Sequence, residues 1–90
     1  MAQAGIAASD YSYVEYIISH ESGWGVTKWN YSGSGAYGLC QSLPASKMSS
    51  AGSDFMTNPI TQLVWCNGYA QSRYGGWANA YYAWLRQNWW

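Results

Sequence analysis

Residues 58–76 read NPITQLVWCNGYAQSRYGG, and this stretch decides the fold. Asn58 is a good helix N-cap, and Pro59 suits the first helical turn, where its missing N–H costs nothing. Apolar side chains then recur at helical spacing along one face: Ile60, Leu63, Val64, Cys66 and Ala70. Gly75 and Gly76 end the pattern, because glycine readily takes the left-handed conformation of a C-cap. We therefore predict a helix from Pro59 to Tyr74 with its apolar face in the core.

Three further helices are predicted around this one. Asp10 is a good N-cap and precedes residues 11–22, whose apolar side chains recur every three to four positions. The cap-then-proline pattern returns before a short helix over about residues 44–50, and another amphipathic stretch follows over 77–88. Residues 28–38 are rich in Gly, Ser, Tyr and Trp and predict a long loop or a short irregular hairpin. The expected fold is mainly α, with four helices around one core and little or no β structure.

The composition fits one small domain that spans residues 1–90. A chain of 90 residues is too short for a second domain. Residues 1–8 have no signal-peptide pattern, so we expect them to be a flexible N-terminal segment of a mature or excised domain. Four Lys and Arg against four Asp and Glu give a net charge of zero, which argues against nucleic acid as a partner. No apolar run approaches the roughly 18 residues of a membrane span, so no membrane insertion is expected.

Cys40 and Cys66 are the two cysteines of the chain. Their even number without C-x-x-C spacing fits one disulfide and an oxidising compartment better than a metal site. Closing a loop of about 26 residues would stabilise the fold by about 3.5 kcal/mol. Two buried thiols packed as small hydrophobic groups are the alternative. The remaining ligand types have no metal-binding spacing either, so we predict neither a metal nor a cofactor.

Glu21 falls on the apolar face of the first predicted helix. The spacing of Val14, Ile17 and Ile18 continues to position 21. A carboxyl group there, beside Trp24 and at the negative end of the helix dipole, should have a raised pKa. A carboxylic acid that stays protonated near neutral pH is what a general acid for glycosidic-bond cleavage requires. The alternative is a last-turn Glu that turns outward into solvent.

Two sequence blocks around this carboxylate resemble a known family. The first block is HESGW at residues 20–24, and the second is GAYGLCQ at residues 35–41, with Pro44 after it. Together they resemble the signature of lytic transglycosylases of the lysozyme-like superfamily. The tail from Asn58 through the closing aromatic residues looks more specifically like the short C-terminal domain of bacterial aggregation-promoting cell-surface factors. The resemblance covers roughly residues 11–90 and implies a small, reduced lysozyme-like domain.

The resemblance implies roles for several positions in the two blocks. Glu21 matches the catalytic acid/base, and Ser22 matches the hydroxyl neighbour that helps to position the acid or the substrate. Gln41 matches an amide that lies in the glycan cleft. Cys40 stands where a Met is common in the family, which suggests that a disulfide to Cys66 ties the cleft loop to the long helix.

Aromatic side chains make up 19% of the chain, which is more ring area than so short a chain needs for its core. Some rings should therefore stack on the C–H faces of sugars. Trp24, Tyr37 and Trp77 lie in or near the family blocks and are the first choices for substrate binding. Tyr81 belongs to an approximate counterpart of the third family block and is a further choice. Each of these rings could instead build the core.

Other positions receive weaker assignments. Three loop residues match positions that let the backbone approach the sugar: Gly35, Gly38 and Leu39. Trp65 and Trp84, at helical spacing, are interpreted as core or packed surface. The Trp89–Trp90 end is either a packed lid or an exposed tip.

The choice of reaction depends on the number of carboxylates. Hydrolysis by two carboxylates needs a second acid across the scissile bond, and Asp54 is the one realistic candidate, with a simple turn-forming role as its alternative. A single-acid route fits better. In the route that the resemblance implies, Glu21 protonates the glycosidic oxygen and then takes a proton from the C6 hydroxyl of the sugar. The product is a 1,6-anhydro-muramic end.

We therefore expect a secreted or cell-surface monomeric enzyme that cleaves the β-1,4 bond between N-acetylmuramic acid and N-acetylglucosamine in peptidoglycan. A glycan-binding or cell-surface interaction module without useful activity is the alternative from another class. The short length and the approximate third block favour that alternative. An antimicrobial wall-lytic hydrolase would use similar chemistry on another target.

Overall fold

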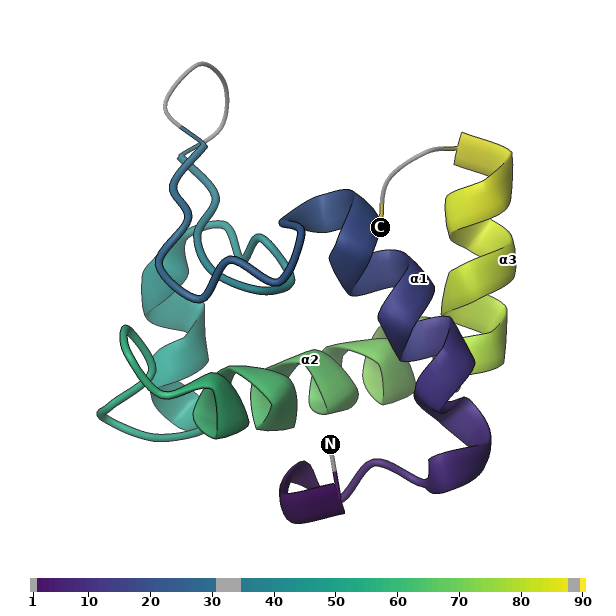
Figure 1. Ribbon diagram of the computed structural model, residues 1–90, viewed down its shortest axis with the longest axis horizontal. Helices are drawn as coiled ribbons and strands as arrows, with labels where there is room; N and C mark the ends of the chain where they lie inside the picture. Colours follow the sequence, from purple (N-terminus) through teal and green to yellow (C-terminus); the bar gives the residue numbers. More distant parts are fainter. Residues whose placement is uncertain (1, 31–34, 88–89) are drawn as a thin grey trace.

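Helices dominate the computed structural model, which describes residues 2–30, 35–87 and 90 (Figure 1). The main helices follow in chain order: α1 (Tyr11–Glu21), the 3-10 helix η3 (Ala45–Ser50), α2 (Pro59–Tyr74) and α3 (Trp77–Gln87). Two three-residue 3-10 turns, η1 (Ala2–Ala4) and η2 (Ala8–Asp10), precede α1. The prediction of a mainly α fold with four helices is confirmed. Asn88 of the predicted last helix and residues 31–34 of the predicted loop lie outside the described residues.

Extended structure is limited to isolated bridges in the described part of the loop. Tyr37 pairs with Trp29 on one side and with Ser42 on the other, both in antiparallel geometry. The expectation of little or no β structure is therefore confirmed for the residues that the structure describes.

The ends of α2 lie where the cap residues predict them. The Asn58 Oδ1 accepts a hydrogen bond from the backbone N–H of Ile60 (2.9 Å), and Pro59 takes the first helical position. At the other end Gly75 has a φ of 78°, and its N–H donates to the carbonyl oxygen of Gln71 (3.0 Å). These contacts satisfy backbone groups that a helix end would otherwise leave unpaired.

The main core lies where the three α-helices meet, and Figure 1 shows α1 and α3 at one end of α2. Its buried members from these helices are Val14, Ile17 and Ile18 of α1, Leu63, Cys66 and Ala70 of α2, and Trp77 and Ala80 of α3. A smaller cluster packs η3 through Ala45 and Met48. The predicted disulfide between Cys40 and Cys66 is present and joins the loop before η3 to the middle of α2.

The N-terminal segment differs from the sequence-based expectation. We expected residues 1–8 to be flexible, but Ala4 and Ile6 are buried in the main core, and η1 packs against α2. The physical reason is the apolar pair itself, because burial of these two side chains favours packing of the segment on α2. Within the described ranges, no helix combines the length and apolar character needed to cross a membrane.

Candidate active site

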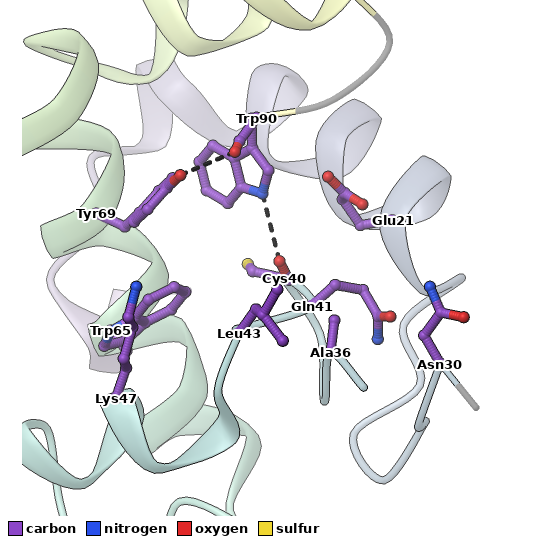
Figure 2. A pocket seen from close by; sticks show the side chains of 10 residues that line it. All are labelled: Glu21, Asn30, Ala36, Cys40, Gln41, Leu43, Lys47, Trp65, Tyr69 and Trp90. Carbon is purple, nitrogen blue, oxygen red and sulfur yellow. Dashed lines mark hydrogen bonds between the residues drawn. The ribbon is translucent and has the colours of Figure 1, made fainter. Parts of the chain in front are cut away.

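A cavity of about 350 Å³ opens between the C-terminal end of α1, the loop before η3, and α2 (Figure 2). Ten residues line it: Glu21, Asn30, Ala36, Cys40, Gln41, Leu43, Lys47, Trp65, Tyr69 and Trp90. Figure 2 shows Glu21 on one side of the cavity and Lys47, Trp65 and Tyr69 on the other. The structure thus brings together two residues that the resemblance singled out, Glu21 and Gln41.

Glu21 is the last residue of α1 and is half-buried at the wall of the cavity. Burial raises the pKa of its carboxyl group above the usual range, because the charged form loses hydration. This is the direction expected from its place on the apolar face of the helix. The chain has four acidic residues, all in the described part, and Glu21 alone lines the cavity.

Two neighbouring side chains oppose this rise in pKa. The indole N–H of Trp84 favours the charged form of Glu21 most strongly, and His20 has the same effect electrostatically. The Trp84 Nε1 is buried and has no hydrogen bond of full geometry in the described part of the chain. The centroid of the Trp84 ring lies 4.9 Å from that of His20 and 5.6 Å from that of Tyr16. These two residues of α1 hold Trp84, which belongs to α3, beside the acid.

The floor of the cavity is fixed through the backbone of Leu39. The Ser22 hydroxyl, buried at the end of α1, donates to the Leu39 carbonyl oxygen (2.7 Å). The Leu39 N–H donates to Oε1 of Gln62 on α2 (2.8 Å). The fully buried Gln62 also donates through Nε2 to the carbonyl oxygens of Val26 and Phe55, each at 2.8 Å. Ser22 therefore helps to fix the loop that carries Cys40 and Gln41, and this loop is held both by the end of α1 and by α2.

Gln41 lines the cavity in a left-handed backbone conformation, with a φ of 54°. Its Nε2 donates to the carbonyl oxygens of Gly38 (2.9 Å) and Lys28 (3.2 Å), so the loop itself orients the amide. Gly38 does not approach the cavity as the resemblance implied. It has a φ of 83°, and a Cβ there would lie 2.6 Å from Oε1 of Gln62. Leu39 is also a packing residue, because only 1% of its side chain is exposed.

Tyr37 and Trp77, predicted to stack on sugars, are buried instead. Trp77 is 1% exposed, and its Nε1 donates to Oδ1 of Asn67 (2.9 Å). Tyr37 is 2% exposed, and its hydroxyl donates to the carbonyl oxygen of Met56 (2.6 Å). Neither ring lines the cavity. Both rings build the core, where their polar atoms find protein partners.

Trp24 and Tyr81 are also outside the cavity. The Trp24 Nε1 donates to Oε1 of Glu15 (3.4 Å), which holds the ring against the exposed side of α1. The Tyr81 ring lies 5.2 Å from that of Tyr13 and 5.0 Å from that of Tyr16, between α3 and α1. The structure therefore assigns both rings to packing between segments rather than to substrate binding.

Asp54 is not a second carboxylate of this site. Its Oδ1 accepts from the Thr61 hydroxyl (2.7 Å), and its Oδ2 accepts from Nδ2 of Asn58 (2.8 Å). These two hydrogen bonds lower the pKa of Asp54. The residue is exposed, does not line the cavity and supports the start of α2, so its turn-and-cap interpretation holds.

The aromatic side of the cavity comes from residues that the sequence analysis did not choose for substrate binding. Trp65, interpreted as core or packed surface, lines the cavity beside Tyr69, one helical turn later on α2. The signal available in the sequence was this i, i+4 spacing, which places both rings on one helix face. Trp90 packs over them: its Nε1 donates to the Cys40 carbonyl oxygen (3.3 Å), and its own carbonyl accepts from the Tyr69 hydroxyl (2.8 Å). Trp89 lies outside the described residues.

The polar and aromatic side chains at the cavity are one carboxyl group, two amides, the ammonium of Lys47 and three aromatic rings. Within the described ranges, no three His, Cys, Asp or Glu side chains gather as a metal site would require. Comparison with known proteins found no family model, no curated protein and no solved structure that matches this chain.

Proposed function

We propose that this protein cleaves the β-1,4-linked glycan strands of peptidoglycan, with Glu21 as both general acid and general base. The observation that carries the proposal is the half-buried Glu21 carboxyl, with its raised pKa, facing an aromatic wall across a cavity. A raised pKa keeps the group protonated at a higher pH, as proton donation to a leaving oxygen requires. Aromatic rings offer flat surfaces on which the C–H faces of sugars can stack. The resemblance of the blocks around Glu21 and Gln41 to lytic transglycosylases supports the same function.

The absence of a second acid at the cavity favours the single-acid route. Glu21 gives its proton to the glycosidic oxygen as the bond between that oxygen and C1 of the muramyl sugar breaks. The C6 hydroxyl of the same sugar then attacks C1, and the Glu21 carboxylate takes the hydroxyl proton. A new C1–O6 bond replaces the broken bond, no water is consumed, and Glu21 returns to its protonated form. Desolvation suits both steps, because it brings the two protonation states of the carboxyl closer in free energy near neutral pH.

The disulfide supports a site of action outside a reducing cytosol. Cys40 lines the cavity and is bonded to Cys66, so reduction would remove the covalent link between the cleft loop and α2. Structural disulfides persist in oxidising environments such as secreted and cell-surface locations. We accordingly place the proposed enzyme at or beyond the cell surface.

The test is mass spectrometry of the soluble products released from purified peptidoglycan by three chains. These are the unmodified protein, the Glu21→Gln variant, and a Glu15→Gln control that changes an exposed carboxylate of the same helix outside the cavity. We expect 1,6-anhydro-muramoyl fragments from the unmodified protein and from Glu15→Gln, and none from Glu21→Gln. The Glu21→Gln chain should fold normally, because it replaces a partly buried acid by a neutral side chain of the same shape.

Each other result has a definite meaning. Reducing-end products that also depend on Glu21 would replace transglycosylation by hydrolysis at the same site. Products that survive Glu21→Gln would refute the assignment of the acid. No products from peptidoglycans of several wall types, with glycan binding retained, would show a glycan-binding module instead of an enzyme.

A further inference from the structure

A second hollow lies next to the cavity at Glu21 and shares part of its wall. This hollow has a volume of about 500 Å³. It is lined by Lys47, Ser50, Ala51, Val64, Trp65, Gly68, Tyr69 and Ser72. Lys47, Trp65 and Tyr69 line both spaces, so the two hollows meet at these three side chains. These three side chains therefore border both the cavity at Glu21 and the face between η3 and α2.

The junction of the two hollows presents a continuous aromatic surface. The rings of Trp65 and Tyr69 are stacked, with centroids 5.1 Å apart and planes 29° from parallel. Next to them Gly68 leaves open space, because a Cβ at that position would meet nothing within 4 Å. The stacked rings turn one face toward each other, and the Arg73 guanidinium lies 5.7 Å from the centroid of Tyr69, so a pyranose would pack its C–H bonds on the parts of the two rings that line the hollow.

Lys47 gives this junction a positive charge. The four Lys and Arg residues all lie in the described part of the chain, and Lys47 is the one that lines either hollow. Its side chain is exposed, and its ammonium forms no ion pair with the described residues. Figure 2 shows it on the side of the cavity opposite Glu21. An anionic group on a bound glycan would therefore be repelled from the Glu21 end when that carboxyl is charged, and attracted to the Lys47 end.

We propose that Lys47, Trp65 and Tyr69 form a subsite for a sugar that carries a carboxylate, with the sugar ring on the two aromatic rings and the carboxylate on Nζ of Lys47. The inference rests on the proposed function for its glycan, since the strand that Glu21 would cut carries a lactyl group on every second sugar, and its carboxyl is free wherever no stem peptide is amide-bonded to it. It adds to that function the position of the bound sugars relative to Glu21. The carboxyl-bearing sugar next to the cleavage point lies across the aromatic wall rather than over the floor at Gln41.

The test compares two oligosaccharides of equal length in the Glu21→Gln background, so that neither is cut. One contains N-acetylglucosamine only. The other alternates N-acetylglucosamine with N-acetylmuramic acid whose lactyl carboxylate is free. Binding is measured by calorimetry, and the indole N–H resonance of Trp65 is followed by NMR. Lys47→Gln is the test variant, and Arg86→Gln, which removes a positive charge from α3 outside both hollows, is the control.

We expect the acidic glycan to bind about 2- to 5-fold more tightly than the neutral one, as one solvent-exposed ion pair would give. Lys47→Gln should remove this preference and leave the affinity for the neutral glycan unchanged, while Arg86→Gln should preserve it. Salt on the order of 0.5 M should narrow the difference, because the pair is exposed. The Trp65 indole resonance should shift with both glycans.

The outcomes separate this subsite from the proposed cleavage. Equal affinity for the two glycans, or a preference that survives Lys47→Gln, would overturn the subsite while Glu21-dependent cleavage could still be observed. If the preference depends on Lys47 but the unmodified protein releases no fragments from peptidoglycan, the subsite is supported and the proposed enzymatic activity is refuted. An unshifted Trp65 resonance at saturating glycan would overturn the aromatic platform.

Discussion

Replacement of Gln62 by Met should cost this small domain a large share of its stability. Methionine has nearly the same length and volume as glutamine, so the change removes three hydrogen bonds with little change in packing. The buried Leu39 N–H would lose its partner at a cost of about 2 kcal/mol, and the part-buried carbonyl oxygens of Val26 and Phe55 would add about 1 kcal/mol each. Burial of the thioether would offset about 1 kcal/mol. The expected loss in free energy of unfolding is therefore about 3 kcal/mol.

The assay is equilibrium unfolding in urea, followed by tryptophan fluorescence and far-UV circular dichroism. The matched control is Gln71→Met, which makes the same change at an exposed position of the same helix and should alter the free energy of unfolding by less than about 0.5 kcal/mol. A loss below about 1 kcal/mol for Gln62→Met would refute the reasoning, because it would mean that water or a rearranged loop satisfies the freed backbone groups.

The other predictions concern the disulfide and the charge state of the acid. Replacing Cys40 and Cys66 together by Ala should lower the free energy of unfolding by about 3.5 kcal/mol, from the chain entropy of a 26-residue separation, and urea unfolding measures it. A loss below about 1 kcal/mol would contradict that account. Trp84→Phe removes an N–H that lowers the pKa of Glu21, so this pKa should rise further and the basic limb of the activity profile should move to higher pH. Carbon-13 NMR of the Glu21 carboxyl measures the shift, and an unchanged or lower pKa would exclude the indole as its partner.

The raised pKa of Glu21 also makes the free energy of unfolding depend on pH. Its folded-state value is raised, so between the unfolded and folded values the folded protein binds more protons than the unfolded chain. The contribution of this carboxyl to stability is therefore full at low pH and is lost as the pH rises through that window. The same group that suits acid catalysis thus weakens the fold slightly at neutral pH.

Helix positions and the acid were predictable because their signals are local. The Asn58 and Pro59 start of α2 and its Gly75 end depend on contacts within a few residues, and the structure reproduces both. Glu21 was found by extending one apolar stripe by a single turn, which again uses only the periodicity of a helix. Such features depend on the local sequence and not on how the helices pack together.

The residues around the acid were harder to predict because their partners are distant in sequence. Gln62 interrupts an apolar stripe, and its partners lie 36, 23 and 7 positions away, so no local pattern indicates its role. The chain has one Phe against seven Trp and nine Tyr, so aromatic rings must build the core as well as any binding surface. Tyr37 and Trp77 went to the core and Trp65 to the cavity, and that division is decided by how the helices pack.

The acid and the far side of the cleft are held by different groups. Glu21 depends on the end of α1 and on the loop fixed at Leu39, whereas Ser50, Val64 and Ser72 line only the hollow between η3 and α2. Substitutions at these three positions would change the surface offered to a glycan without touching the groups around the carboxyl. If the proposed function holds, the scaffold is suited to directed evolution: a library at these wall positions would select new glycan preferences while Glu21 and its contacts stay unchanged.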